Sequence, residues 1–182
     1  LKRLLNSLLD QDIRSDIFEV LVVSDGSTDN THDYLTAFCR KHPSFRWTGQ
    51  QNQGPAAARN LGLSCVESAL VAFTDDDCLA DSGWVQAILN MFNTRPDILG
   101  MEGRTVTISE DTTPLTHQLE GSGQCYATAN VAYRRETLQE AGGFDPAFFY
   151  GNEDVDVAWR VMERGPVVYN KHMVIIHPPI PR

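Results

Sequence analysis

Three consecutive aspartates, Asp75, Asp76 and Asp77, stand at the end of the largely apolar run of residues 70–74. A short apolar run bounded by polar residues is typical of a buried strand, so the three carboxylates stand at the strand's carboxyl end. In open α/β sheets, ligands bind at that edge. Three like charges so close together repel one another and require a cation or several hydrogen-bond donors. The triplet therefore predicts a divalent-cation site shared with phosphate oxygens; a solvated acidic turn is the alternative.

Strand-like and helix-like segments alternate along the first half of the chain. Apolar, β-branched runs predict strands at 18–23 and 45–48, and helical spacing of apolar residues predicts helices at 1–11, 30–41 and 56–67. Short connections between such segments predict an α/β fold with a Rossmann-like, mostly parallel sheet flanked by helices. In that fold the loop that starts at Asp25 lies at the same sheet edge as the acidic triplet, because both follow strands.

The second half of the chain is less regular. The pattern predicts helices at 84–92, 135–141 and 150–164 and strands at 99–108, 128–133, 167–169 and 173–177. Residues 109–125 are polar and rich in glycine, with no apolar periodicity. We interpret them as a loop that closes over the bound ligand as a lid.

Composition limits the class of protein. The 182 residues suit one domain, and 42% hydrophobic with 21% charged residues is ordinary for a globular protein. A net charge of −9 argues against nucleic acid as a partner but not against a nucleotide bound through a metal. Four widely spaced cysteines, with Cys39 and Cys65 expected to be reduced and buried, favour a cytoplasmic location. The sequence contains no apolar stretch of the roughly 20 residues that a membrane span needs.

A second acidic group lies at the start of the helix predicted after Gly151. Helical spacing in this helix predicts one apolar face that contains Val155, Ala158, Trp159 and Met162. Glu153, Asp154 and Asp156 fall in its first turn, where carboxylates complement the helix dipole and Asn152 can act as the N-cap. Asp156 is one turn from Arg160 and is assigned to an ion pair. Transfer of a group to a hydroxyl needs a base, and a helix N-terminus keeps a carboxylate base ionised. Asp154 is the candidate base, and Glu153 supports it or contacts the acceptor.

Two further residues carry possible ligand contacts. Arg59 lies near the start of a helix that follows Gly54 and Pro55, where small residues permit close approach and a guanidinium can bind a base edge or a phosphate. His177 ends a strand-like apolar run, so it is either structural or a third strand-end ligand for the metal.

Five segments, taken together, resemble glycosyltransferase family 2, whose members have the GT-A fold and use nucleotide sugars. These segments are residues 22–29, 54–60, 73–77, 142–145 and 153–156. The resemblance implies a single domain over 1–182, with a nucleotide-binding half at about 1–80 and an acceptor and catalytic-base half at about 81–182. It implies an inverting transfer of a sugar, from a UDP-sugar by family frequency, to a glycan, lipid or small-molecule acceptor. Members usually begin with a strand that is absent here before residue 1.

The resemblance also assigns roles on the donor side. Asp25 hydrogen-bonds the nucleobase, and Arg59 lies near the base or the phosphates. Asp75 and Asp77 are the ends of an Asp-x-Asp motif: Asp75 faces the ribose or the ion, and Asp77 ligates Mg²⁺ or Mn²⁺. His177 resembles a metal-binding histidine found in some members.

On the acceptor side, the resemblance makes Asp154 the base of a single displacement and places Asn130 in the sugar or acceptor pocket. Polysaccharide, glycan or glycolipid synthesis is the expected pathway, with peripheral association at the inner face of a membrane left open. A non-catalytic sugar-nucleotide-binding or scaffold domain is the competing hypothesis. A nucleotidyltransferase is disfavoured, because no Gly-rich segment with Lys or Arg stands near the N-terminus. The sugar, nucleobase, acceptor, processivity and oligomeric state are not determined by the sequence.

Overall fold

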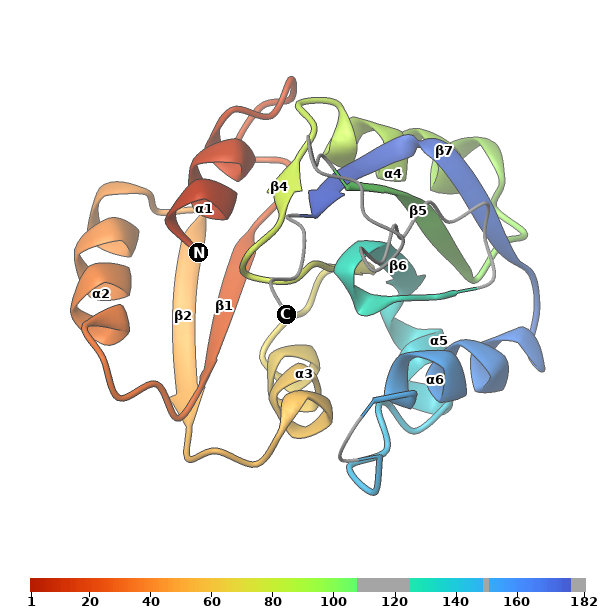
Figure 1. The fold of residues 1–182 in the computed structure, drawn as a ribbon. Helices are drawn as coiled ribbons and strands as arrows, with labels where there is room; N and C mark the ends of the chain where they lie inside the picture. Colours follow the sequence, from red (N-terminus) through yellow and green to blue (C-terminus); the bar gives the residue numbers. More distant parts are fainter. Residues whose placement is uncertain (108–124, 149–150, 178–182) are drawn as a thin grey trace.

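The computed structural model describes residues 1–107, 125–148 and 151–177, and its strands fall into two sheets (Figure 1). The first sheet pairs β1 (Val20–Asp25) in parallel with β2 (Phe45–Gln50). The second has the order β3-β6-β5-β7-β4. Its strands are β3 (Leu70–Phe73), β4 (Leu79–Ala80), β5 (Gly100–Thr107), β6 (Val131–Arg134) and β7 (Val167–His177).

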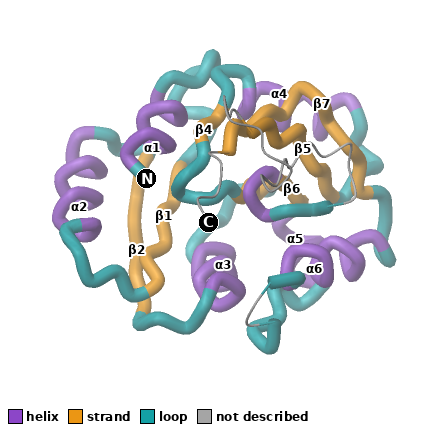
Figure 2. Tube along the Cα trace, in the orientation of Figure 1, coloured by secondary structure: helices purple, strands orange, loops and turns teal. Residues whose placement is uncertain are grey.

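Helices flank the sheets, as Figure 2 shows, and the α/β class predicted from the alternation is confirmed. The helices are α1 (Lys2–Leu9), α2 (Thr31–Lys41), α3 (Pro55–Ser64), α4 (Trp84–Thr94), α5 (Arg135–Glu140) and α6 (Glu153–Met162), with a 3₁₀ turn at Thr128–Asn130. The described part of the chain contains no helix long and apolar enough to cross a membrane.

Strand direction decides which residues meet at the ligand edge. β3 and β5 are each antiparallel to β6, and β5 is parallel to β7. β3, β5 and β7 therefore run in one direction, while β6 and the short β4 run in the other. The acidic triplet after β3 and His177 at the end of β7 consequently lie at the same edge of the sheet.

The two sheets are not joined by a ladder. Among the described residues, β1 pairs only with β2, and β3 pairs only with β6, so each has one edge without a strand partner. The strands predicted at 167–169 and 173–177 form one strand, β7, because a register shift opposite Gly103 and Arg104 absorbs the irregular residues between them.

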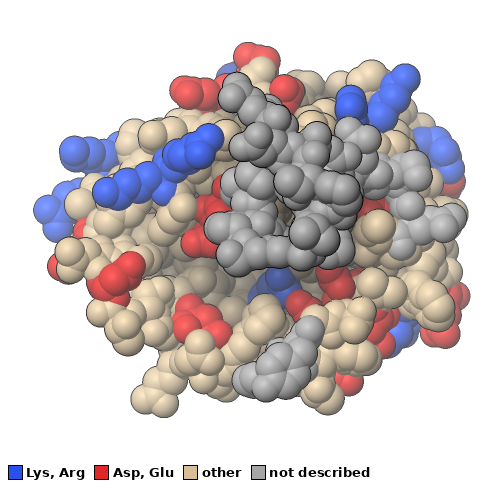
Figure 3. Space-filling model, in the orientation of Figure 1, with Lys and Arg blue, Asp and Glu red and all other residues tan. Residues whose placement is uncertain are grey.

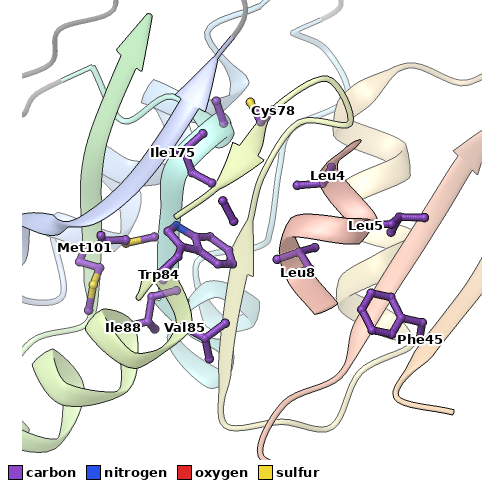
Figure 4. Close-up of a cluster of buried hydrophobic side chains, with 14 of the residues drawn as sticks. Leu4, Leu5, Leu8, Phe45, Cys78, Trp84, Val85, Ile88, Met101 and Ile175 are labelled. Atoms are coloured by element: carbon purple, nitrogen blue, oxygen red, sulfur yellow. The ribbon is translucent and has the colours of Figure 1, made fainter. Parts of the chain in front are cut away.

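The larger core joins α1 and α4 to the sheets. Leu4, Leu5 and Leu8 of α1 recur at helical spacing and are buried. Figure 4 shows them in the same apolar cluster as Phe45 of β2, with Trp84 of α4 and Met101 of β5 further along the cluster. Residues from both sheets thus share one core, which fixes the N-terminal half against the C-terminal half.

A second core holds α6 and corrects one sequence interpretation. Helical spacing indicated an apolar face containing Trp159, but that side chain is 64% exposed. Glu153, Val157 and Val161, each one turn apart, are buried instead. The helix is rotated because Glu153 faces inward toward the half-buried guanidinium of Arg59, and Val157 and Val161 lie in the core on the same side. Asn152 occupies the N-cap position with φ 72° but makes no side-chain capping bond.

Candidate functional site

Acidic side chains gather on the face in Figure 3, where a basic side chain is flanked by acidic ones. The acidic triplet contributes first. Asp75 and Asp77 are 41% and 54% exposed, and Nε2 of His177 lies 3.7 Å from Oδ1 of Asp77. His177 itself is buried. The structure therefore brings together the three residues that the sequence assigned to the metal.

The electrostatics of Asp75 show what this group lacks. Burial raises the pKa of its carboxyl; the Arg59 charge opposes that rise, the Asp77 charge adds to it, and smaller opposed effects come from His177 and Asp76. Carboxylates that disfavour one another's ionisation fit a divalent cation, whose charge relieves the repulsion. Carboxylate oxygen with imidazole nitrogen is a donor set that Mg²⁺ and above all Mn²⁺ accept. The residues present fit the ion.

Cys78 extends this group, and the sequence analysis did not assign it. Its side chain is buried, and Sγ lies 3.8 Å from Oδ1 of Asp77. Burial, reinforced by the Asp75 and Asp77 charges, raises the pKa of the thiol to about 12. Within the described residues, Asp77, Cys78 and His177 form a group whose ligand atoms all lie within 4.8 Å of one another. Cys39 and Cys65 are free thiols as expected but are half-buried rather than buried.

Arg59 connects the strand edge to α6. Its Nη1 donates a 2.6 Å hydrogen bond to Oε1 of Glu153, and its Nη2 lies 3.7 Å from Oδ1 of Asp75. The guanidinium also lies 5.7 Å from the ring centroid of Phe144, which meets Phe73 edge-on. Arg59 is thus held by two carboxylates and an aromatic face, and it lies between the two halves of the site.

The start of α6 places the candidate base beside this pair. Glu153 is the first residue of α6, and its second carboxylate oxygen, Oε2, is buried without a hydrogen-bond partner in the described structure. Asp154 follows; its Oδ1 accepts a 2.9 Å bond from the backbone N–H of Val155 at the helix N-terminus. Asp156 pairs with Arg160, as the i, i+4 spacing predicted. Glu153 forms an ion pair with Arg59, whereas Asp154 forms none with any described residue, so these two neighbouring carboxylates have different surroundings.

Asp25 organises the loop opposite. Its carboxylate accepts hydrogen bonds from the side chain of Gln50 (2.8 Å) and from the backbone N–H groups of Gln53 (2.9 Å) and Gly54 (2.8 Å). Partial burial acts against the charge, but the three donors outweigh it and lower the pKa of Asp25. Gly26 lets the two loops meet, since a Cβ there would stand 2.8 Å from the backbone nitrogen of Asn52. Asp25 fixes the loop that begins α3, and with it the position of Arg59.

Asn60 explains why two distant motifs occur together. Its side-chain NH₂ donates a 2.7 Å hydrogen bond to the carbonyl of Phe144, and its Oδ1 accepts a 2.9 Å hydrogen bond from the backbone N–H of Phe144. Gly143, at φ 68°, lies so close that a Cβ would stand 2.6 Å from Oδ1 of Asn60. The segment around 54–60 is therefore locked to the glycine pair at 142–143, which positions Phe144 against Arg59.

Asn130 lies apart from this group. It is 1% exposed, and its amide bonds the indole N–H of Trp84 (2.8 Å) and the carbonyls of Arg104 (2.9 Å) and Met173 (3.0 Å). Both ends of the side chain are thus used to join α4, β5 and β7. The expected place in a sugar or acceptor pocket does not fit this geometry, because no face of Asn130 is open.

Glu102 and Tyr133 are polar groups near Asp154 that the sequence analysis missed. Glu102 is buried in β5 and accepts a 2.8 Å bond from the N–H of Tyr126. Burial, then the Glu102 and Asp154 charges, raises the pKa of Tyr133. Glu102 stands between Met101 and Gly103 within β5, and a charged residue between these two uncharged ones was the available signal. The lid predicted at 109–125 lies outside the described residues, apart from its last position.

The loops at the carboxyl ends of β1, β3 and β7 are acidic, and Arg59 joins the loop after β3 to α6. The family model described as glycosyl transferase family 2 matches residues 1–156. The chain belongs to this family.

Related proteins agree with the family and the fold. An uncharacterized glycosyltransferase of Nostoc sp. is 32% identical over 93% of this chain, and the chain spans 54% of that relative's length. The structure of the Staphylococcus aureus protein TarS (residues 1–349) in complex with UDP-GlcNAc is similar to this chain, with TM-score 0.81 and 21% identity. The match covers all of this chain and 55% of the TarS chain. The mannosyltransferase PcManGT of Pyrobaculum calidifontis, in complex with GDP-Man and Mn²⁺, matches 95% of this chain and 51% of its own, with TM-score 0.73 and 21% identity. The fold of this chain is therefore the GT-A fold.

Proposed function

We propose that this chain forms the catalytic domain of a metal-dependent, inverting glycosyltransferase. The donor is a sugar nucleoside diphosphate, with UDP as the expected nucleotide, and the acceptor is a hydroxyl group. The observation that carries the proposal is the Arg59 network, which joins Asp75 at the acidic strand end to Glu153, the neighbour of Asp154. In this proposal, one guanidinium links the donor-binding residue Asp75 to the carboxylate next to the base Asp154.

On the donor side, the loop held by Asp25 faces the nucleotide and Arg59 stands beside the phosphates. Asp77 and His177, with Asp75, would hold a Mg²⁺ or Mn²⁺ ion. That ion, when bound, neutralises the negative charge of the departing diphosphate. Arg59 adds a second positive charge at the same place and needs no rearrangement, because Glu153 and Phe144 already fix its orientation.

On the acceptor side, Asp154 acts as the base. The acceptor oxygen forms a bond to the anomeric carbon on the face opposite the diphosphate, and the bond from that carbon to the diphosphate oxygen breaks with its electron pair. The acceptor proton passes to a carboxylate oxygen of Asp154. The N-terminus of α6 stabilises the charged carboxylate before transfer. A single displacement inverts the configuration at the anomeric carbon.

The expected donor follows from the ligands of two proteins with the same fold. TarS and PcManGT were solved with UDP-GlcNAc and GDP-Man. We expect this chain to take a donor of that chemical class and to act in polysaccharide, glycan or glycolipid synthesis. A cytoplasmic position, with peripheral association at the inner face of a membrane, belongs to the same proposal.

Nucleoside diphosphate release tests the proposal. The chain is incubated with UDP-GlcNAc, UDP-glucose or GDP-mannose, with Mn²⁺, with Mg²⁺ or with EDTA, and thermal shift is recorded in parallel. We expect one donor to raise the melting temperature and to be hydrolysed only with metal. Binding without turnover would favour the non-catalytic sugar-nucleotide-binding domain. Metal-independent turnover would overturn the metal assignment, and no response to any donor would overturn the proposal.

A further inference from the structure

The sulfur of Cys78 lies within reach of the group that is proposed to hold the divalent ion. Sγ is 3.8 Å from Oδ1 of Asp77, which is 3.7 Å from Nε2 of His177. Ligand atoms that share a tetrahedral metal with bonds of about 2.0–2.3 Å are separated by roughly 3.3–3.5 Å. The two separations from Asp77 exceed these values by a few tenths of an ångström, and the sulfur and the His177 ring nitrogen lie within 4.8 Å of each other. Side-chain rotation can bring the three atoms closer together.

The backbone directs the sulfur toward this group. The N–H of Cys78 donates a 3.1 Å bond to the carbonyl of Asp75, and this turn carries the chain from β3 toward β4. Figure 4 shows Cys78 at the end of the apolar cluster, beside Ile175 of β7. His177 is two residues after Ile175 on the same strand. Cys78 therefore belongs to the apolar cluster, and its sulfur lies within 4.8 Å of ligand atoms of Asp77 and His177.

The three ligand atoms differ in chemical hardness, and this decides which ions they prefer. Carboxylate oxygens suit Mg²⁺ and Mn²⁺, imidazole suits Zn²⁺ and Co²⁺ among others, and thiolate sulfur favours softer ions. Oxygen and nitrogen alone would leave Mn²⁺ a suitable ion. A sulfur ligand raises the affinity of the site for softer ions and does not raise its affinity for Mn²⁺.

We propose that Cys78 is a metal ligand, and that Asp77, Cys78 and His177 form a site for thiophilic divalent cations such as Zn²⁺, Co²⁺ and Cd²⁺. This inference rests on the metal site of the proposed function and makes that site open to competition. A softer ion bound through sulfur occupies Asp77 and His177 and displaces Mn²⁺. Coordination replaces the S–H bond by a sulfur–metal bond, and the proton passes to solvent.

Cobalt absorption tests the inference without any activity measurement. The test protein carries Cys39→Ser, Cys65→Ser and Cys125→Ser, so that Cys78 is its sole thiol. Co²⁺ is titrated while the near-ultraviolet band of sulfur-to-cobalt charge transfer is recorded, and calorimetry measures binding of Co²⁺, Zn²⁺ and Mn²⁺. We expect the band to appear in step with binding and Zn²⁺ to displace Mn²⁺.

The matched variant adds Cys78→Ser, which keeps the shape and replaces sulfur by oxygen. We expect this variant to lose the band and to bind Zn²⁺ at least roughly ten-fold more weakly, with Mn²⁺ affinity little changed. Because a buried substitution can unfold the chain, near-ultraviolet absorption of Cd²⁺ bound to the Cys78-containing protein gives a second readout that needs no variant. Cobalt binding without a sulfur band would overturn the role of Cys78 and leave the metal site standing. No binding of any of the ions, with or without UDP, would overturn the metal site itself.

Discussion

Nη1 of Arg59 donates a 2.6 Å hydrogen bond to Oε1 of Glu153, which lies 94 positions later in the chain. The two side chains are 19% and 6% exposed, so the pair is largely removed from water. Removing one partner of such a pair leaves the other charge buried and uncompensated. The bond therefore couples the stability of the domain to the relative position of α3 and α6, and hence of Asp75 and Asp154.

Arg59→Ala is expected to lower the free energy of unfolding by about 3–5 kcal/mol, because it leaves the Glu153 carboxylate buried without a cation. Adding Glu153→Gln to Arg59→Ala removes that charge and should recover part of the loss. Urea denaturation of the two single variants and the double variant measures the coupling. Purely additive effects would show that the pair contributes no interaction of its own.

Asp77→Asn is expected to weaken Mn²⁺-dependent nucleoside diphosphate binding by about ten-fold or more, because a ligand contributes at least as much as the residues that support it. Its side chain is 54% exposed, so the melting temperature without ligand should not change. Calorimetry with UDP and Mn²⁺ measures the affinity. Asp76→Asn, at an exposed neighbour, is the matched control and should bind UDP like the unchanged chain. Equal affinity in Asp77→Asn and Asp76→Asn would remove Asp77 from the metal site.

Asp154→Asn is expected to reduce the rate of transfer by roughly 100-fold or more while donor affinity stays the same, because the amide keeps the shape but cannot accept the proton. Product formation and donor binding are measured separately. Asp156→Asn is the control from the same helix turn, since Asp156 pairs with Arg160. That control should alter stability and leave kcat unchanged. Near-normal transfer by Asp154→Asn would make Glu153 the next candidate base.

Asp25→Asn is expected to destabilise the chain by about 1–3 kcal/mol at neutral pH, because an amide NH₂ then faces one of three hydrogen-bond donors. The pKa of Asp25 is lowered in the folded chain. Its stabilising effect is therefore present above the unfolded pKa of about 3.9 and is lost as the pH falls through the lower folded pKa. The stability difference between the unchanged chain and Asp25→Asn should shrink below about pH 4. Urea denaturation over a pH series measures it, and a pH-independent difference would mean that charge is not the cause.

Local pattern was enough to predict which loops follow the carboxyl ends of the strands. The apolar run before Asp75 and the strand before Asp25 are short-range signals, and strand direction then places both at carboxyl ends. His177 could be assigned for the same reason. The α6 helix was also predicted, but its rotation was not, because an apolar count ranks Trp159 above Glu153 for burial. Glu153 faces inward because it bonds the guanidinium of Arg59, which lies in α3, far from α6 in the sequence.

Contacts between distant segments could not be predicted from one sequence. Asn130 carried a pocket assignment by resemblance, whereas its amide holds Trp84, Arg104 and Met173 together. Cys78 received no assignment, since its nearness to His177 depends on β7 returning beside β4, 99 positions later. Each case depends on which strands are neighbours, and periodicity within a segment carries no such information.

Gly143→Ala is expected to destabilise the chain more than Gly142→Ala, although both glycines have positive φ, at 68° and 89°. Either alanine is strained by about 1–2 kcal/mol in the left-handed region. At Gly142 the new Cβ meets only Nη1 of Arg160 at 3.7 Å, whereas at Gly143 it stands 2.6 Å from Oδ1 of Asn60. Displacing Asn60 breaks its two bonds to Phe144 and adds about 1–3 kcal/mol. In an Asn60→Ala background this extra cost should vanish. Urea denaturation of Gly143→Ala and Gly142→Ala, each alone and combined with Asn60→Ala, measures it. Equal extra costs in both backgrounds would show that Asn60 is not the cause.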